Sequence, residues 1–160
     1  MPRTDAINQL IAALLGEDIL GVVVRTHIHI EARLNALLEI AVPHPSLLPN
    51  LRYEQRLRLA CALGLHERWF KQLKLLGDIR NKFGHRIDAD LTEEMVSGLE
   101  YAFDPQDLPG FLAGVQAANP EISTFEEFRK WPPKRRFVML AVGLDKMLEM
   151  AAQEFMQHDA

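Results

Sequence analysis

The stretch Asp18-Ile-Leu-Gly-Val-Val-Val-Arg-Thr-His-Ile-His-Ile-Glu-Ala-Arg-Leu-Asn-Ala-Leu-Leu-Glu-Ile-Ala41 decides the fold class of this chain. Its β-branched beginning could be read as a strand, yet apolar residues recur at every third or fourth position for about six turns, until Pro43. A half-buried strand needs alternation with a period of two and is seldom so long. We therefore expect one long amphipathic helix at the centre of the fold, with Asp18 as its N-cap.

The same apolar spacing predicts shorter helices elsewhere. They begin near residues 4, 51, 67, 92, 123 and 133, and the helix from 67 ends near Gly84. Between 104 and 120 two prolines and two glycines interrupt the pattern, so we expect little regular structure there. No pair of strands joined by a turn is visible. The sequence predicts a single all-α domain over 1–160, an irregular bundle of four to five main helices with short accessory helices.

Composition is that of an ordinary globular protein. Of the 160 residues, 48% are hydrophobic and 25% are charged, so one core is expected. No run approaches the roughly 18 apolar residues of a membrane span, and we expect a cytoplasmic protein without membrane contact. The single cysteine, Cys61, cannot form an internal disulfide. The net charge of −4 argues against non-specific coating of nucleic acid and leaves room only for a local basic patch.

The most unusual polar stretch is Arg80-Asn-Lys-Phe-Gly-His85, at the end of the helix predicted from residue 67. Asp78, Asn81 and His85 follow one another at intervals of three and four residues. Side chains with this spacing share one face of a helix. The stretch is therefore the first place to look for a functional site.

Arg80 lies on another face of this helix, between Gly77 and Gly84. A glycine inside a helix costs about 1 kcal/mol relative to alanine, so we expect a backbone or a ligand to come close beside Arg80. In one interpretation Arg80 and His85 act on a phosphodiester, since guanidinium stabilises charge on phosphate oxygens and imidazole moves a proton. In the other, which the spacing alone favours, Gly84 ends the helix and Arg80 pairs with an acid such as Glu31.

Four basic residues surround Trp131, namely Lys130, Lys134, Arg135 and Arg136. Basic side chains beside an aromatic ring are one signature of nucleic-acid contact. Because no recognisable pair of DNA-reading helices accompanies them, we favour a solvated helix start.

The sequence contains no clear signature of a metal or a cofactor. His27 and Glu31 are spaced as two metal ligands on a helix, but a site needs more than two ligands and there is no His-Glu-x-x-His. There is also no glycine-rich phosphate loop and no nucleophile elbow. We expect neither a metal nor a cofactor.

Two motifs resemble known families. Arg80-Asn-Lys-Phe-Gly-His85 resembles the R-N-x-x-x-H signature of the HEPN superfamily, all-α proteins that commonly dimerise and in many members cleave RNA. The segment Leu57-Arg-Leu-Ala-Cys-Ala-Leu-Gly-Leu65, together with 79–85 and Glu31-x-x-Leu-Asn-x-Leu-Leu38, is similar to proteins of the mannitol operon repressor type, an all-α family of transcriptional regulators. The second resemblance spans about half of the chain.

These resemblances imply two functions. The regulator resemblance implies a homodimeric, non-enzymatic interaction module in which Glu31, Arg80 and Asn81 hold the bundle or an interface together, acting through a protein partner or directly on DNA. The HEPN resemblance implies a metal-independent ribonuclease in which His85 is the base on a ribose 2′-hydroxyl, Arg80 stabilises the phosphate and Asn81 orients. In such dimers the two motifs face each other across a cleft. From the sequence we favour the regulator and keep the ribonuclease as the alternative.

Overall fold

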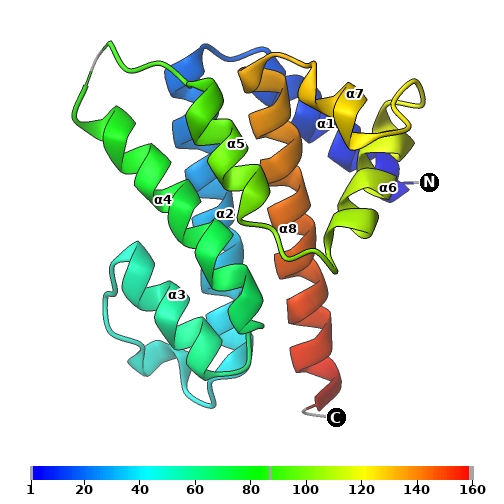
Figure 1. Cartoon of the computed structure of the whole chain (residues 1–160). Helices are drawn as coiled ribbons and strands as arrows, with labels where there is room; N and C mark the ends of the chain where they lie inside the picture. Colours follow the sequence, from blue (N-terminus) through cyan, green and yellow to red (C-terminus); the bar gives the residue numbers. More distant parts are fainter. Residues whose placement is uncertain (1, 87, 159–160) are drawn as a thin grey trace.

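The protein is an all-helical bundle, as the sequence predicts. A computed structural model describes residues 2–86 and 88–158, and within those residues it contains helices and no strand (Figure 1). The helices are α1 (Pro2–Leu15), α2 (Ile19–Ala41), α3 (Tyr53–Ala62), α4 (Phe70–Gly84), α5 (Glu93–Tyr101), α6 (Leu108–Ala118), α7 (Phe125–Arg129) and α8 (Pro133–His158), with 3₁₀ turns η1 (Pro45–Leu47) and η2 (Glu67–Trp69).

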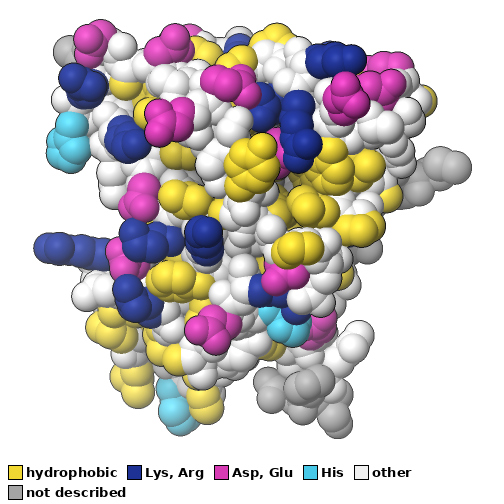
Figure 2. All heavy atoms as spheres, viewed as in Figure 1, with side chains coloured by type: hydrophobic (Ala, Val, Ile, Leu, Met, Phe, Trp, Pro, Cys, Tyr) yellow, Lys and Arg dark blue, Asp and Glu magenta, His cyan; other side chains and the backbone are white. Residues whose placement is uncertain are grey.

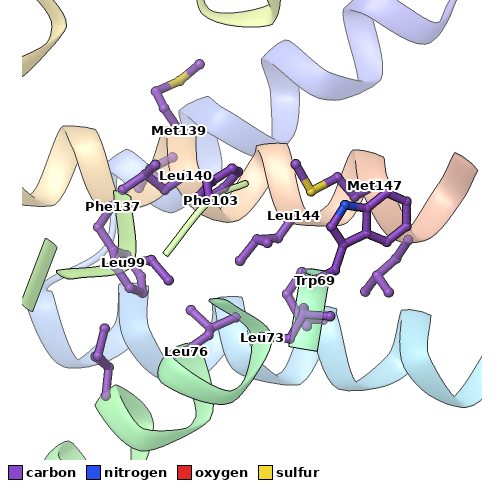
Figure 3. Packing of buried hydrophobic residues seen from close by; sticks show 14 of the residues in the cluster. Trp69, Leu73, Leu76, Leu99, Phe103, Phe137, Met139, Leu140, Leu144 and Met147 are labelled. Atoms are coloured by element: carbon purple, nitrogen blue, oxygen red, sulfur yellow. The ribbon is translucent and has the colours of Figure 1, made fainter. Parts of the chain in front are cut away.

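The two longest helices, α2 and α8, pack along each other at the centre, and α2 also contacts α1, α3 and α4 (Figure 1). Leu34 and Leu37 of α2 and Leu140 and Leu144 of α8 have no exposed surface. Buried side chains of α4, α5 and α8 pack against one another in the core of the bundle (Figure 3). Since each fully buried leucine contributes about 1.5–3 kcal/mol, this apolar contact supplies most of the driving force for folding.

One ion-pair cluster accompanies the apolar contact between α2 and α8. Arg33 Nε donates to Asp145 Oδ1 at 2.6 Å, and His29 Nε2 lies 3.0 Å from the same oxygen. Burial alone would raise the pKa of Asp145, but the contacts with His29 and Arg33 hold it below its ordinary value. The carboxylate therefore stays charged between the two helices.

Helix starts follow local sequence closely. Asp18 Oδ1 accepts a hydrogen bond from the Gly21 amide at 2.6 Å, so the predicted N-cap is confirmed. Thr92 and Thr124 cap α5 and α7 through the amides of Met95 and Glu127. A cap needs only a side-chain oxygen and an amide about three residues on, and for this reason it can be recognised in a sequence.

The expectation of little regular structure over 104–120 is wrong, because α6 occupies Leu108–Ala118. Pro109 lies in the first turn of α6, where a missing amide hydrogen breaks no helical bond. Phe111 and Val115, one turn apart, are buried and anchor the helix. The Phe111 ring reaches α8 at Gly143, where a Cβ would lie 2.8 Å from its Cδ2. Tertiary packing thus overrides the low helix propensity of this segment.

The interpretation of Arg136 as a nucleic-acid contact is also wrong, because its side chain is 1% exposed. Its Nη2 lies 3.3 Å from Oε2 of Glu100, which is itself 3% exposed, and its guanidinium also pairs with Glu93. Arg129 binds the other oxygen of Glu100 at 2.6 Å. This buried cluster ties α5 to α7 and α8.

Replacing Arg136 tests the role of the cluster. Arg136→Met leaves the buried carboxylate of Glu100 with Arg129 as its remaining cation, and we expect the free energy of unfolding to fall by about 3 kcal/mol. Urea denaturation followed by circular dichroism measures the change. Lys130→Met, which removes an exposed cation nearby, is the control and should change stability by less than about 0.5 kcal/mol. Equal effects of the two substitutions would contradict a stabilising cluster.

Candidate functional site

The predicted polar stretch occupies the C-terminal end of α4. The apolar stripe of this helix is buried against the bundle, through Leu73, Leu76, Ile79 and Phe83. Because the opposite face must then point to solvent, Arg80, Asn81 and His85 are all exposed. In Figure 2 the upper left corner, where α4 ends, carries basic, acidic and histidine side chains together.

Arg80 does not form the ion pair with Glu31 that the sequence favoured. Arg80 Nη1 lies 3.4 Å from Asn81 Oδ1, and it makes no other hydrogen bond or ion pair within residues 2–86 and 88–158. A Cβ added at Gly84 would lie 3.7 Å from Arg80 Nη1, so the guanidinium extends along the helix toward Gly84. Glu31 instead accepts from Arg56 Nη1 of α3 at 2.8 Å.

The close approach predicted at Gly77 is made by a side chain, the ring of Tyr53. A Cβ at Gly77 would lie 2.7 Å from Tyr53 Cε1, which is too close for two carbon atoms. Tyr53 Oη donates to the Leu73 carbonyl at 2.8 Å, and burial raises the pKa of this phenol. Gly77 therefore allows α3 to pack closely on α4 and is not itself a ligand site.

The helix ends at Gly84 as predicted, but by a different geometry. His85 is the C-cap with φ of −113°, and in the described residues the glycine with positive φ is Gly64, at 121°. Gly84 itself is exposed. Its missing side chain leaves room beside Arg80 instead of providing a left-handed turn.

A buried histidine of α2, His27, lies near enough to Arg80 for the positive charge of Arg80 to affect its pKa. The ring of His27 on α2 is 4.5 Å from the ring of Tyr53, and its Nδ1 is 4.0 Å from Glu31 Oε2. Burial lowers the pKa of His27; the carboxylate of Glu31 opposes that effect, and the positive charge of Arg80 reinforces it. The folded protein thus favours the neutral form of the His27 imidazole.

The basic residues around Trp131 do not form one surface. Lys134 Nζ donates to the Leu15 carbonyl at 2.8 Å and so caps the end of α1. Arg135 donates to Asn119 Oδ1 at 2.7 Å and stacks on Trp131, 3.7 Å from the ring centroid. With Arg136 buried, Lys130 is the exposed member of the group. The structure does not support the patch as a phosphate-binding surface.

Among the side chains that the structure describes, no three His, Cys, Asp or Glu residues are grouped to hold a metal ion. The part of the chain that the structure describes also contains no helix long and apolar enough to cross a membrane.

No protein-family model, curated protein or solved structure matches this chain. The resemblances of Arg80–His85 and Leu57–Leu65 to known families stay predictions from sequence motifs.

The lowered pKa of His27 predicts a pH dependence of stability. The folded state prefers the neutral imidazole, so the contribution of His27 is complete above the unfolded pKa of 6.5 and is lost as pH falls through the lower folded pKa. Between about pH 7.5 and about pH 5, the free energy of unfolding should therefore fall more steeply in the wild type than in His27→Gln. Urea denaturation at several pH values measures both slopes. His44→Gln, which changes an exposed histidine, is the control, and parallel slopes for wild type and His27→Gln would contradict the assignment.

Proposed function

We propose that the exposed end of α4 binds and cleaves RNA without a metal ion. The carrying observation is that Arg80 and His85, a guanidinium and an imidazole, are exposed at one helix end and form no ion pair with any described residue. A structural role would have placed them in contact with acids, as it does for Arg56, Arg129 and Arg136. This is why the ribonuclease, which the sequence ranked second, becomes the leading candidate.

The residue types fit cleavage by the neighbouring ribose hydroxyl. His85 takes the proton of the 2′-hydroxyl, O2′ bonds to phosphorus, and the bond from phosphorus to O5′ breaks. Arg80 stabilises the charge that develops on the phosphate oxygens. Asn81, 3.4 Å from Arg80, can orient the guanidinium or the phosphate. The products are a 2′,3′-cyclic phosphate and a 5′-hydroxyl.

The leaving O5′ needs a proton, and a second copy of the chain supplies the simplest donor. In a homodimer whose two α4 ends face each other, one His85 acts as base and the other as acid. An exposed apolar stripe on α2 supports such an association: Leu20 and Ile28 are 46% and 59% exposed, with Val24 midway between them. Burying this stripe in a dimer would remove apolar surface from water.

Substitutions at the end of α4 test the proposal. A fluorescent RNA pool with excess chelator should be cut by the wild type, and His85→Ala should lower the rate at least about 100-fold, because both the base and the acid of the proposed dimer are lost. Arg80→Gln should have a comparable effect. Lys82→Ala removes another exposed cation of the same helix end and should change the rate by less than about threefold. Unchanged thermal unfolding of all three variants would show that folding is intact.

Two outcomes would overturn the proposal. One is that the purified wild type leaves the RNA uncut at a protein concentration suited to catalysis, although no inhibitor is bound to it. The other is equal cleavage by the wild type and His85→Ala, which would point to a contaminating nuclease.

A regulator of the mannitol operon repressor type is the second candidate, and one observation favours a form of it that acts through a protein partner. Lys134, Arg135 and Arg136 are engaged within the fold and leave Lys130 as the exposed cation of the group, so no surface suited to direct DNA contact is formed there. Fluorescence anisotropy with duplex DNA should then detect no salt-dependent binding. Binding that weakens with salt and is reduced by Lys130→Ala would instead indicate direct contact.

A further inference from the structure

A half-open cavity of about 470 Å³ lies near the N-terminal end of α4 and is lined by residues of α1, η2, α6 and α8. Its walls are mainly apolar and include Ile11, Trp69, Phe111, Val115, Met139 and Met147. Cavities of this size and lining are typical of sites for small organic ligands. Since α4 has 15 residues, the cavity and the Arg80–His85 site are separated by about 20 Å along the helix.

The cavity is wide because two of the α6 residues that line it are glycines. Gly110 and Gly114 are one turn apart in the lining, and a Cβ added at either would meet no atom within 4 Å. Ala117 and Ala118 continue the same side. Larger residues at these positions would fill the space and favour the helix, so the glycines cost stability while leaving room open.

The opposite wall can adapt its shape. Met139, Met147 and Met150 line the cavity from α8. Methionine is unbranched and polarizable, and it fills irregular gaps against different partners. An apolar ligand can therefore be accommodated by movement of the methionine side chains, without movement of the α6 or α8 backbone.

The charged residues of the lining are already paired. Asp107 accepts from Arg68 Nε at 3.1 Å and from Trp69 Nε1 at 2.8 Å. His66 Nε2 lies 3.4 Å from Glu154, and Lys146 Nζ lies 2.9 Å from Glu149. A charged ligand would lose hydration and find its counter-charge occupied, whereas an uncharged one would not.

We propose that this cavity binds an uncharged, mainly aliphatic small molecule with one hydroxyl end. The apolar walls take the chain, and the amides of Asn8 and Gln106, both in the lining and exposed, offer neutral hydrogen-bonding groups to the hydroxyl. The site is independent of the RNA-cleaving proposal, because none of its residues belongs to the end of α4.

Trp69 provides the readout. In a Trp131→Phe protein, Trp69 is the remaining tryptophan, and its emission reports on the cavity. Titration with 1-decanol should change that emission saturably, while decanoate and decylamine should bind at least about tenfold more weakly, a difference of about 1.4 kcal/mol. Isothermal titration calorimetry of the unmodified protein with the three compounds provides the same comparison without a substitution.

Matched glycine substitutions locate the site. Gly114→Leu places a side chain in the open space and should abolish decanol binding, and Gly110→Leu serves if that variant does not fold. Gly98→Leu on α5 is the control, since a Cβ there also meets no atom within 4 Å but the residue lies outside the cavity. Among the glycine variants, we expect Gly98→Leu to bind decanol as the unsubstituted protein does and Gly114→Leu not to bind it. No saturable binding of decanol, tighter binding of either charged compound, or retained binding in folded Gly114→Leu would each overturn the proposal.

Discussion

Asp145 of α8 lies between Arg33 and His29 of α2, in the middle of the contact between the two longest helices, and the other helices are arranged around that contact. Leucine packing drives the two helices together but has no direction. The carboxylate adds a bond with fixed geometry at 2.6 Å. The position of α8 along α2 in turn sets where α1, α4 and α5 can pack.

Helix α4 illustrates what this arrangement does for function. Its apolar stripe, from Leu73 to Phe83, packs against the bundle and holds the helix in place. Residues at the two ends of the helix can therefore take part in binding or catalysis. The C-terminal end presents Arg80 and His85 to solvent, while η2, which leads into the N-terminal end, places Trp69 at the wall of the cavity. The two ends of α4 thus lie beside different surfaces, one polar and exposed and the other a mainly apolar cavity.

The position of the candidate site could be read from the sequence, but the partners of its residues could not. The spacing of Arg80, Asn81 and His85 correctly indicates the end of a helix, since helix geometry repeats every 3.6 residues. From the sequence, Glu31 could pair with any of several cations, depending on how the helices pack. The packing of α2 against α3 brings Arg56 to Glu31 instead of Arg80. Gly77 signals a close approach, yet only packing decides that the ring of Tyr53 makes it.

The sequence by itself determined the all-α class, the long central helix with its cap at Asp18, and the helix starts near residues 92 and 123, because these depend mainly on residues close together in the chain. Tertiary structure decided the rest. It made α6 helical despite Pro109 and its glycines, by burying Phe111 and Val115, and it buried Arg136 against acids more than thirty residues away. The energies of such contacts depend on which residues, far apart in the sequence, meet in the folded protein. Neither helix propensity nor a run of charged residues predicts those meetings.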